Sequence, residues 1–269
     1  MASAAAISRS PDGARLALGA AYWLFVIYLF APLMLMVAMS FKDANFIAFP
    51  IQNWTLNWYA ETVRDQQFLS AALYTIWIAF ATMVAATIIG VWIALLIASE
   101  NIGGKAVLFA LACLPAVVPG MIHAIAMRIF VASIDLPTGT GAIILGHTVH
   151  AVPFVVVMVL TRLRAMPPNL VDAARDLGAD PVVAFFRVTL PFLGPALVGG
   201  MLFAVLLSVD DFVRTFFLGG YRPTLTMLIF ARVQGGMSPG INAMATLILL
   251  VTAAVGLYAE RMTRRARTR

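Results

Sequence analysis

The chain has few of the residues on which most enzymes and metal sites depend. Its 269 residues include one cysteine, Cys113, and three histidines, and only 11% are charged. A single cysteine excludes an internal disulfide and a metal cluster held by several cysteines of this chain. The segment Gly103-Gly104-Lys105 lacks the spacing and the following Ser or Thr of a phosphate-binding P-loop. We therefore expect no catalytic residues, no cofactor bound by this chain and no ATP hydrolysis by it.

Two of the three histidines, His147 and His150, lie three residues apart, which would place them on one face of a helix. Two metal ligands could be arranged in this way, but a zinc site needs three or four protein ligands and the sequence offers no evident third. We expect hydrogen-bonded packing roles for both histidines and no metal site.

Long apolar runs make up most of the chain. Hydrophobic residues account for 62% of it and the mean hydropathy is +0.95, far above the range of soluble domains. About 20 apolar residues in a helix cross a bilayer. We expect an all-α, polytopic protein that contacts lipid through six transmembrane helices, in a permease domain over residues 16–259. The expected spans are approximately residues 16–40, 70–99, 106–134, 141–163, 192–211 and 241–259.

The positions of Lys and Arg predict which loops face the cytoplasm, because basic residues near short loops are retained on that side. Arginines occur in the tails, residues 1–15 and 260–269, and in the loop 164–191. Six spans place these three segments on one side, so we expect both termini and this loop to be cytoplasmic. The first apolar run is much longer than that of a cleavable signal peptide, which predicts a retained anchor.

The formal net charge of +6 has two possible meanings, membrane topology or nucleic-acid binding. The basic residues lie at membrane boundaries and are not interleaved with aromatic residues. We interpret the charge as a topology signal and as contact with lipid headgroups, with no nucleic-acid partner.

The loop between the fourth and fifth spans contains the signals of two short helices. Asn169 is a good N-cap, Asp172 follows it three residues later as in a capping box, and Gly178 can end the helix in the left-handed conformation. Asp180 with Pro181 predicts the start of a second helix, which would end at Pro191. The first helix would be amphipathic and short, and would fit a surface groove better than a bilayer. Its apolar positions are Leu170, Val171, Ala174 and Leu177.

This loop resembles the EAA signature of binding-protein-dependent ABC transporter permeases. The family usually has Glu at the first position of the signature and Ile before Leu-Pro, where this chain has Asp and Val. The match consists of Asp172-Ala173-Ala174, then Gly178 after three residues, and Val188-Thr189-Leu190-Pro191 after nine more. The resemblance implies contact with an ATPase by a set of coupling residues. They are Asp172, Ala173, Ala174, Gly178, Leu190 and Pro191.

Four further segments resemble the subgroup of these permeases associated with spermidine and putrescine uptake: residues 40–42, 53–59, 208–212 and 238–243. The resemblance implies a type I ABC importer transmembrane fold in a bacterial inner membrane. The implied partners are two copies of an ATPase that binds ATP and Mg, a second, homologous permease subunit and a periplasmic binding protein. The implied solute is a polyamine such as spermidine or putrescine, with aminoethylphosphonate, an opine or another small polar compound as alternatives.

Two places in the expected spans are candidates for the translocation pathway. Pro115 and Pro119 should kink or interrupt the third span, and such breaks usually line a cavity. Asp210 and Asp211 end the fifth span, where two adjacent carboxylates are costly. They either attract a cationic solute or pair with Arg214 as a salt bridge at a helix end, and the sequence leaves both possibilities open.

Two other features of the spans have both a structural and a functional interpretation. Arg128, in the third span, is costly at membrane depth, and either it is functional or it lies near the outer interface. In the second span, small residues recur every four positions, which permits close helix packing and predicts an interior helix; the alternative is a chance ridge in an Ala-rich helix. The ridge consists of Thr82, Ala86, Gly90, Ala94 and Ala98.

The alternative from another functional class is a gradient-driven secondary transporter or channel that uses Asp210 and Asp211 as its ion site. Such proteins often contain two related halves, and no clear repeat relates residues 1–134 to 135–269. A scaffold without transport is disfavoured by the proline-broken span and by the two carboxylates.

Overall fold

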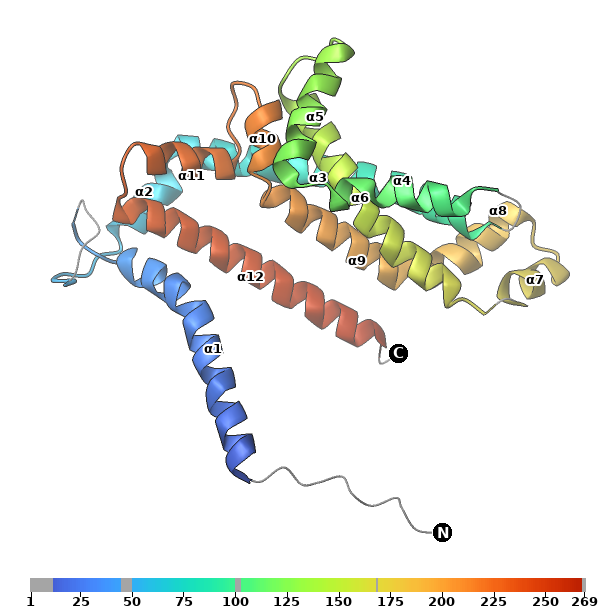
Figure 1. The fold of residues 1–269 in the computed structure, drawn as a ribbon, viewed down its shortest axis with the longest axis horizontal. Coiled ribbons are helices and arrows are strands. Elements are labelled where there is room, and N and C mark those ends of the chain that lie inside the picture. The colour runs from blue at the N-terminus through green and yellow to red at the C-terminus, as the bar shows by residue number, and fades with distance from the viewer. Residues whose placement is uncertain (1–11, 45–49, 100–102, 168, 268–269) are drawn as a thin grey trace. The chain divides into compact units, whose positions relative to one another are not determined.

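The computed structural model describes residues 12–44, 50–99, 103–167 and 169–267, and every regular element within them is helical (Figure 1). The chain forms two compact units, Met1–Thr62 with Gly236–Leu250, and Val63–Gly235 with Val251–Arg269. In chain order the helices are α1 (Asp12–Met39), α2 (Asn57–Arg64), α3 (Gln66–Ala98), α4 (Lys105–Val117), α5 (Gly120–Ser133), α6 (Thr140–Arg164), α7 (Asn169–Asp176), α8 (Pro181–Ala184), the π-helix η1 (Phe185–Thr189), α9 (Leu190–Val209), α10 (Val213–Leu218), α11 (Leu225–Gln234) and α12 (Pro239–Arg267).

In the smaller unit, the segment that follows α1 folds back onto itself. Lys42 and Trp54 form an isolated antiparallel bridge, and the indole N–H of Trp58 donates to the carbonyl of Lys42 at 2.9 Å. The Ser40 hydroxyl lies 2.5 Å from the hydroxyl of Tyr59. These bonds bring residues 40–42 and 53–59 together, although they are separated along the chain.

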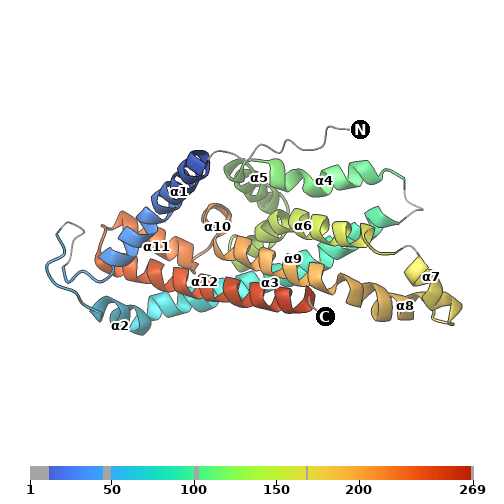
Figure 2. The ribbon, with the colours of Figure 1, turned by 90° about the horizontal axis from the view of Figure 1, so that it is seen from below.

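The core of the larger unit lies where α3, α6 and α9 pack side by side (Figure 2). The small-residue ridge of α3 faces this core, as predicted, but large apolar side chains of the same helix, such as Trp77 and Trp92, are exposed, so α3 is interior on one side only. Within the ridge, Ala98 is the exception, because it is exposed at the end of α3. The buried members of the ridge are Thr82, Ala86, Gly90 and Ala94.

Four helices of the described residues are long and apolar enough to cross a membrane: α1 from Gly13, α3, α6 and the continuous helix Pro181–Val209. A fifth candidate, the pair α4 and α5, is bent by 109°. The apolar part of α12, Pro239–Ala254, is shorter than these spans. The predicted count of six transmembrane helices is therefore not exactly confirmed by the described residues.

The break between α4 and α5 confirms the predicted interruption of the third span. Pro119 has no N–H to donate and holds Val118 in an extended conformation, with φ −69° and ψ 131°. Pro115, in contrast, lies inside α4. One of the two prolines therefore breaks the span, and the other is accommodated by it.

The expectation that Pro191 ends a separate second helix is wrong. The helix that starts at Pro181 continues through η1 into α9, so the fifth span begins well before residue 192. In η1 the N–H of Leu190 bonds to the carbonyl of Phe185, five residues back. Pro191 follows directly after the π turn of η1 and lies inside this continuous helix.

Asp65 ties the start of α3 to α11 within the larger unit. Its side chain accepts from the N–H groups of Gln67 and Phe68 at 2.8 and 3.2 Å and forms an ion pair with Arg232. Burial raises the Asp65 pKa, but the hydrogen bond from Arg232 and those from the two N–H groups outweigh it and hold the pKa below its usual value.

We expect Asp65→Asn to lower the free energy of unfolding by about 0.5–1 kcal/mol at neutral pH. Asparagine keeps the helix cap and removes the charge. The ionic contribution is complete above the unfolded pKa of about 3.9 and is lost as the pH falls through the lower folded value. The free energies of unfolding of purified wild type and variant, measured between pH 7 and pH 3, test this expectation. A difference between the two free energies that does not become smaller at the acid end would contradict it.

Candidate functional site

The end of α7 has the predicted turn geometry. Gly178 has a φ of +86°, its N–H bonds to the carbonyl of Arg175 at 2.8 Å, and the N–H of Ala179 bonds to the carbonyl of Ala174 at 3.0 Å. Gly178 thus closes α7 in the left-handed conformation, as predicted. Asn169 is the first residue of α7 and not the cap before it, a position that lies outside the described residues.

The second helix starts as predicted. Asp180 is the N-cap of α8, and one of its carboxylate oxygens accepts from the N–H groups of Val182 and Val183 at 2.8 and 2.9 Å. Pro181 occupies the first turn. The turn between α7 and α8 is therefore fixed by a capping interaction on each side.

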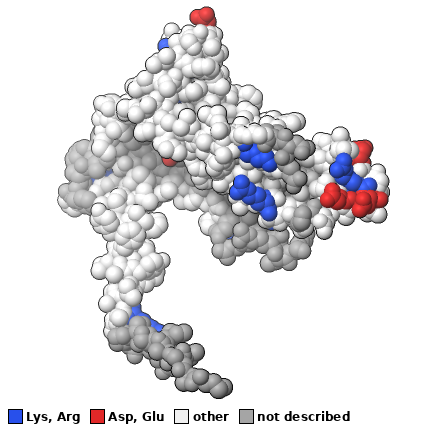
Figure 3. Space-filling view, turned by 45° about the vertical axis from the view of Figure 1, so that its right-hand side comes forward, with Lys and Arg blue, Asp and Glu red and all other residues white. Residues whose placement is uncertain are grey.

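Helix α7 is exposed on several sides. Asp172, Ala173 and Gly178 are exposed, Ala174 is half-buried, and the apolar side chain of Leu177 is 90% exposed. Acidic and basic side chains gather at this end of the larger unit, next to a surface with few charges (Figure 3). Val182 and Phe186, after the turn, are also exposed, and several uncovered apolar side chains beside charged ones are suited to contact another protein.

The six predicted coupling residues of the EAA-like signature fall into two places. Asp172, Ala173, Ala174 and Gly178 lie together on α7 and its closing turn, whereas Leu190, half-buried, and Pro191, exposed, start α9. Contacts between α7 and η1 connect the two places. The exposed surface of α7 is therefore joined to the membrane helix that follows it.

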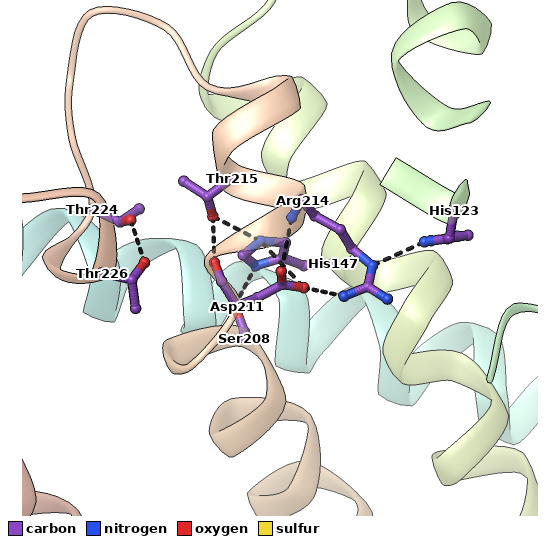
Figure 4. Close-up of polar contacts among 8 residues, drawn as sticks. All are labelled: His123, His147, Ser208, Asp211, Arg214, Thr215, Thr224 and Thr226. Atoms are coloured by element: carbon purple, nitrogen blue, oxygen red, sulfur yellow. Dashed lines mark hydrogen bonds and ion pairs between the residues drawn. The ribbon is translucent and has the colours of Figure 1, made fainter. Parts of the chain in front are cut away.

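A second site surrounds the turn between α9 and α10, where Asp211 is buried. One of its carboxylate oxygens accepts from the backbone N–H of Arg214 at 2.9 Å, and the other lies 2.6 Å from Nη1 of the same arginine. Of the two interpretations open at Asp211, the structure supports the pairing with Arg214 (Figure 4). Asp210, in contrast, is exposed.

His147 of α6 is fully hydrogen-bonded. Its Nδ1 lies 2.8 Å from the Ser208 hydroxyl, and its Nε2 lies 3.1 Å from the hydroxyl of Thr215, whose proton is donated to the carbonyl of Asp211. Nε2 must therefore carry the ring proton, and Nδ1 accepts from Ser208. This confirms the predicted packing role for His147.

Arg214 also reaches α5, a contact that the sequence analysis missed. Its Nε–H donates to Nδ1 of His123 at 2.9 Å, and both side chains are buried (Figure 4). The two residues are 91 positions apart, so no local spacing relates them. The only signal was the presence of a polar residue in each of two apolar segments.

A cavity of about 390 Å³ opens beside this cluster. It is lined by His150, Leu206, Leu207, Asp210, Asp211, Phe212, Val213 and Arg214. Both aspartates predicted for the pathway therefore face one cavity, while Pro115 and Pro119 are outside its lining. Pro119 nevertheless precedes Gly120, where an added Cβ would lie 4.0 Å from Nη2 of Arg214. Arg128, further along α5, is exposed.

Known proteins resemble the chain over most of its length. Residues 86–269 match the family described as binding-protein-dependent transport system inner membrane component. The putrescine transport system permease protein PotI of Escherichia coli (strain K12) is 35% identical over 248 residues, which cover 89% of this chain and 88% of that protein. The spermidine/putrescine transport system permease protein PotC of Haemophilus influenzae is 28% identical over 247 residues, 90% of this chain and 95% of that protein.

Two solved structures share the fold. A chain of a bacterial ABC transporter involved in the import of the acidic polysaccharide alginate aligns with a TM-score of 0.73 and 17% identity, over 93% of this chain and 94% of that chain. A chain of the MetNI methionine ABC transporter aligns with a TM-score of 0.62 and 21% identity, over 73% and 94%. At these identities the two structures support the fold and give no information about the solute.

Proposed function

The chain belongs to the family of binding-protein-dependent transport system inner membrane components, and on this premise we propose that it passes a polyamine, putrescine or spermidine, into the cytoplasm. It is a multi-pass permease subunit of an ABC importer in the inner membrane. Importers of this kind work with an ATPase and a binding protein. This membership sets aside the gradient-driven secondary transporter.

The observation that carries the choice of solute is the 35% identity to a putrescine permease over nearly the whole chain. The chemistry of the cavity supports it, because Asp210 offers an exposed carboxylate to a cation at the end of a membrane helix. A polyamine carries one ammonium group at each end. Aminoethylphosphonate and opines also carry an amino group, but unlike a polyamine they carry anionic groups as well, which the Asp210 carboxylate would repel.

We place the ATPase at α7. Asp172, Ala173 and Leu177 are uncovered in this chain, and the αL turn at Gly178 fixes the helix against the start of the fifth span. Two ATPase copies would receive α7 and its counterpart on a second, homologous permease subunit, and would hold the ATP and Mg that this chain is not built to bind. Both termini and α7 would then be cytoplasmic, with the binding protein on the opposite side.

Uptake of radiolabelled putrescine tests the proposed solute. Cells without polyamine uptake of their own would produce the chain together with its ATPase, companion permease and binding protein. We expect uptake of labelled putrescine. Unlabelled spermidine should reduce this uptake by competition, and aminoethylphosphonate should not. Uptake of aminoethylphosphonate instead, with no transport of putrescine, would overturn the assignment.

We expect Asp210→Asn to lower the rate of putrescine uptake by up to about fivefold, since an ion pair at an exposed carboxylate is worth up to about 1 kcal/mol. Asp135→Asn is the matched control: Asp135 is exposed, lies in the turn between α5 and α6, and has a φ of 54° that asparagine tolerates. The control should transport at the wild-type rate. Equal rates for the two variants would exclude Asp210 from the pathway.

A further inference from the structure

The two adjacent aspartates of the cavity differ in what they offer to a cation. Asp210 is exposed, whereas both carboxylate oxygens of Asp211 are occupied by donors of Arg214. His147 Nε2 also lies 3.8 Å from one of these oxygens. An incoming ammonium group therefore finds Asp210 available and Asp211 already neutralised by a cation of the protein.

The guanidinium of Arg214 uses only some of its hydrogen-bond donors. Nη1 contacts Asp211 and Nε donates to His123, while an arginine side chain has five N–H donors. The side chain bridges α10 to the first turns of α5, just after the break at Pro119. Its position thus depends on two helices, one of which starts at a bend in the chain.

A buried ring nitrogen without a hydrogen-bond partner lies in the same cavity lining as Arg214. Nδ1 of His150 is buried with no hydrogen-bond partner among the described residues, and His150 lines the same cavity as Arg214. When the ring proton is on Nε2, this nitrogen is an acceptor. Because a buried polar atom without a partner is costly, an available donor would stabilise it.

We propose that Arg214 is a displaceable counter-ion, which neutralises Asp211 in the resting permease and moves toward His150 when an ammonium group of the solute takes its place. The inference rests on the proposed cationic solute. An ammonium group brings three donors and one positive charge, so it can replace the guanidinium at Asp211. Nδ1 of His150 then accepts a hydrogen bond from the displaced guanidinium, and Asp210, in the lining of the same cavity, balances its positive charge. The cavity then offers two carboxylates in succession, Asp210 first and Asp211 after the exchange.

The test is a set of binding measurements on the purified complex of permease subunits and ATPase, without the binding protein. The probes are radiolabelled putrescine and n-butylammonium. We expect weak binding to wild type and at least tenfold tighter binding to Arg214→Gln, because the competing cation is gone. The double variant Asp211→Asn/Arg214→Gln should return to the wild-type affinity. The control is Arg232→Gln, which removes an arginine paired with Asp65 away from this cavity and should leave the affinity unchanged.

If folded Arg214→Gln binds neither probe more tightly than wild type, the displacement is overturned. If that variant does not fold, Arg214→Lys replaces it. Lysine keeps the charge but cannot hold Asp211 and His123 with a planar fork, so we expect a smaller but measurable gain in affinity. No gain in the lysine variant would overturn the proposal equally. A wrong solute assignment gives a different pattern, since n-butylammonium would still bind Arg214→Gln more tightly while wild-type cells took up no putrescine.

Discussion

Replacing Gly178 with proline is expected to abolish solute uptake while the protein still inserts in the membrane. Proline requires a φ near −65°, whereas Gly178 has a φ of +86°, and the substitution also removes the N–H that bonds to Arg175. The turn after α7 would open and α7 would lose its fixed orientation toward the fifth span. The measurement is putrescine uptake, normalised to the amount of protein in the membrane.

Gly178→Asn is the control, because asparagine tolerates the left-handed conformation and keeps the N–H. We expect it to retain uptake within about twofold, since the αL cap remains. Ala173→Trp should also abolish uptake, because its large side chain would overfill the proposed contact between α7 and the ATPase while the turn stays intact. Normal uptake by both the proline and the tryptophan variants would contradict the role given to α7.

The second large effect is expected at Gly90, where α3 and α6 approach closely. A Cβ at this position would lie 2.6 Å from Cγ1 and 2.7 Å from Cβ of Val155. Because the Cβ of Val155 is bonded directly to the backbone of α6 and cannot move without it, Gly90→Ala should lower the free energy of unfolding by about 1–3 kcal/mol. Unfolding of the detergent-solubilised protein measures the loss.

Gly199→Ala is the matched control for this substitution. Gly199 also lies in a membrane helix, but its added Cβ would meet only the Met158 sulfur, at 3.7 Å, which is an ordinary contact. This variant should be neutral or up to about 1 kcal/mol more stable, because alanine favours the helix. Equal stabilities for the two variants would mean that α3 and α6 are not packed as closely as the structure places them.

Features set by a few neighbouring residues could be predicted from the sequence. The turn at Gly178, the cap at Asp180 and the break at Pro119 each follow from the backbone preferences of one or two residues. The ridge on α3 follows from a four-residue period. In each of these cases the physical cause and its effect lie within one helical turn.

Features that depend on distant residues could not be predicted in this way. The continuation of α8 through Pro191 requires a π-helix, whose single extra residue per turn has no signature in the sequence. The contact between Arg214 and His123 requires two helices to meet that are far apart in the chain. The sequence identified Asp210 and Asp211 as a pair, but only tertiary packing separates an exposed carboxylate from a neutralised one.

Site-specific cross-linking shows whether the ATPase contacts the proposed surface, α7. In a Cys113→Ala background, which has no other cysteine, one variant carries Ala173→Cys on α7. A second carries Tyr221→Cys, a fully exposed position in the segment that follows Leu218. Leu218 accepts a hydrogen bond from Gly139, at the start of α6, and α6 is 25 residues or about 37 Å long. The two cysteines therefore lie toward opposite ends of α6.

We predict that the ATPase cross-links to position 173 and not to position 221 in the assembled importer. Cross-linking of the ATPase to position 221, or to neither position in a complex that still transports putrescine, would show that α7 is not the ATPase contact.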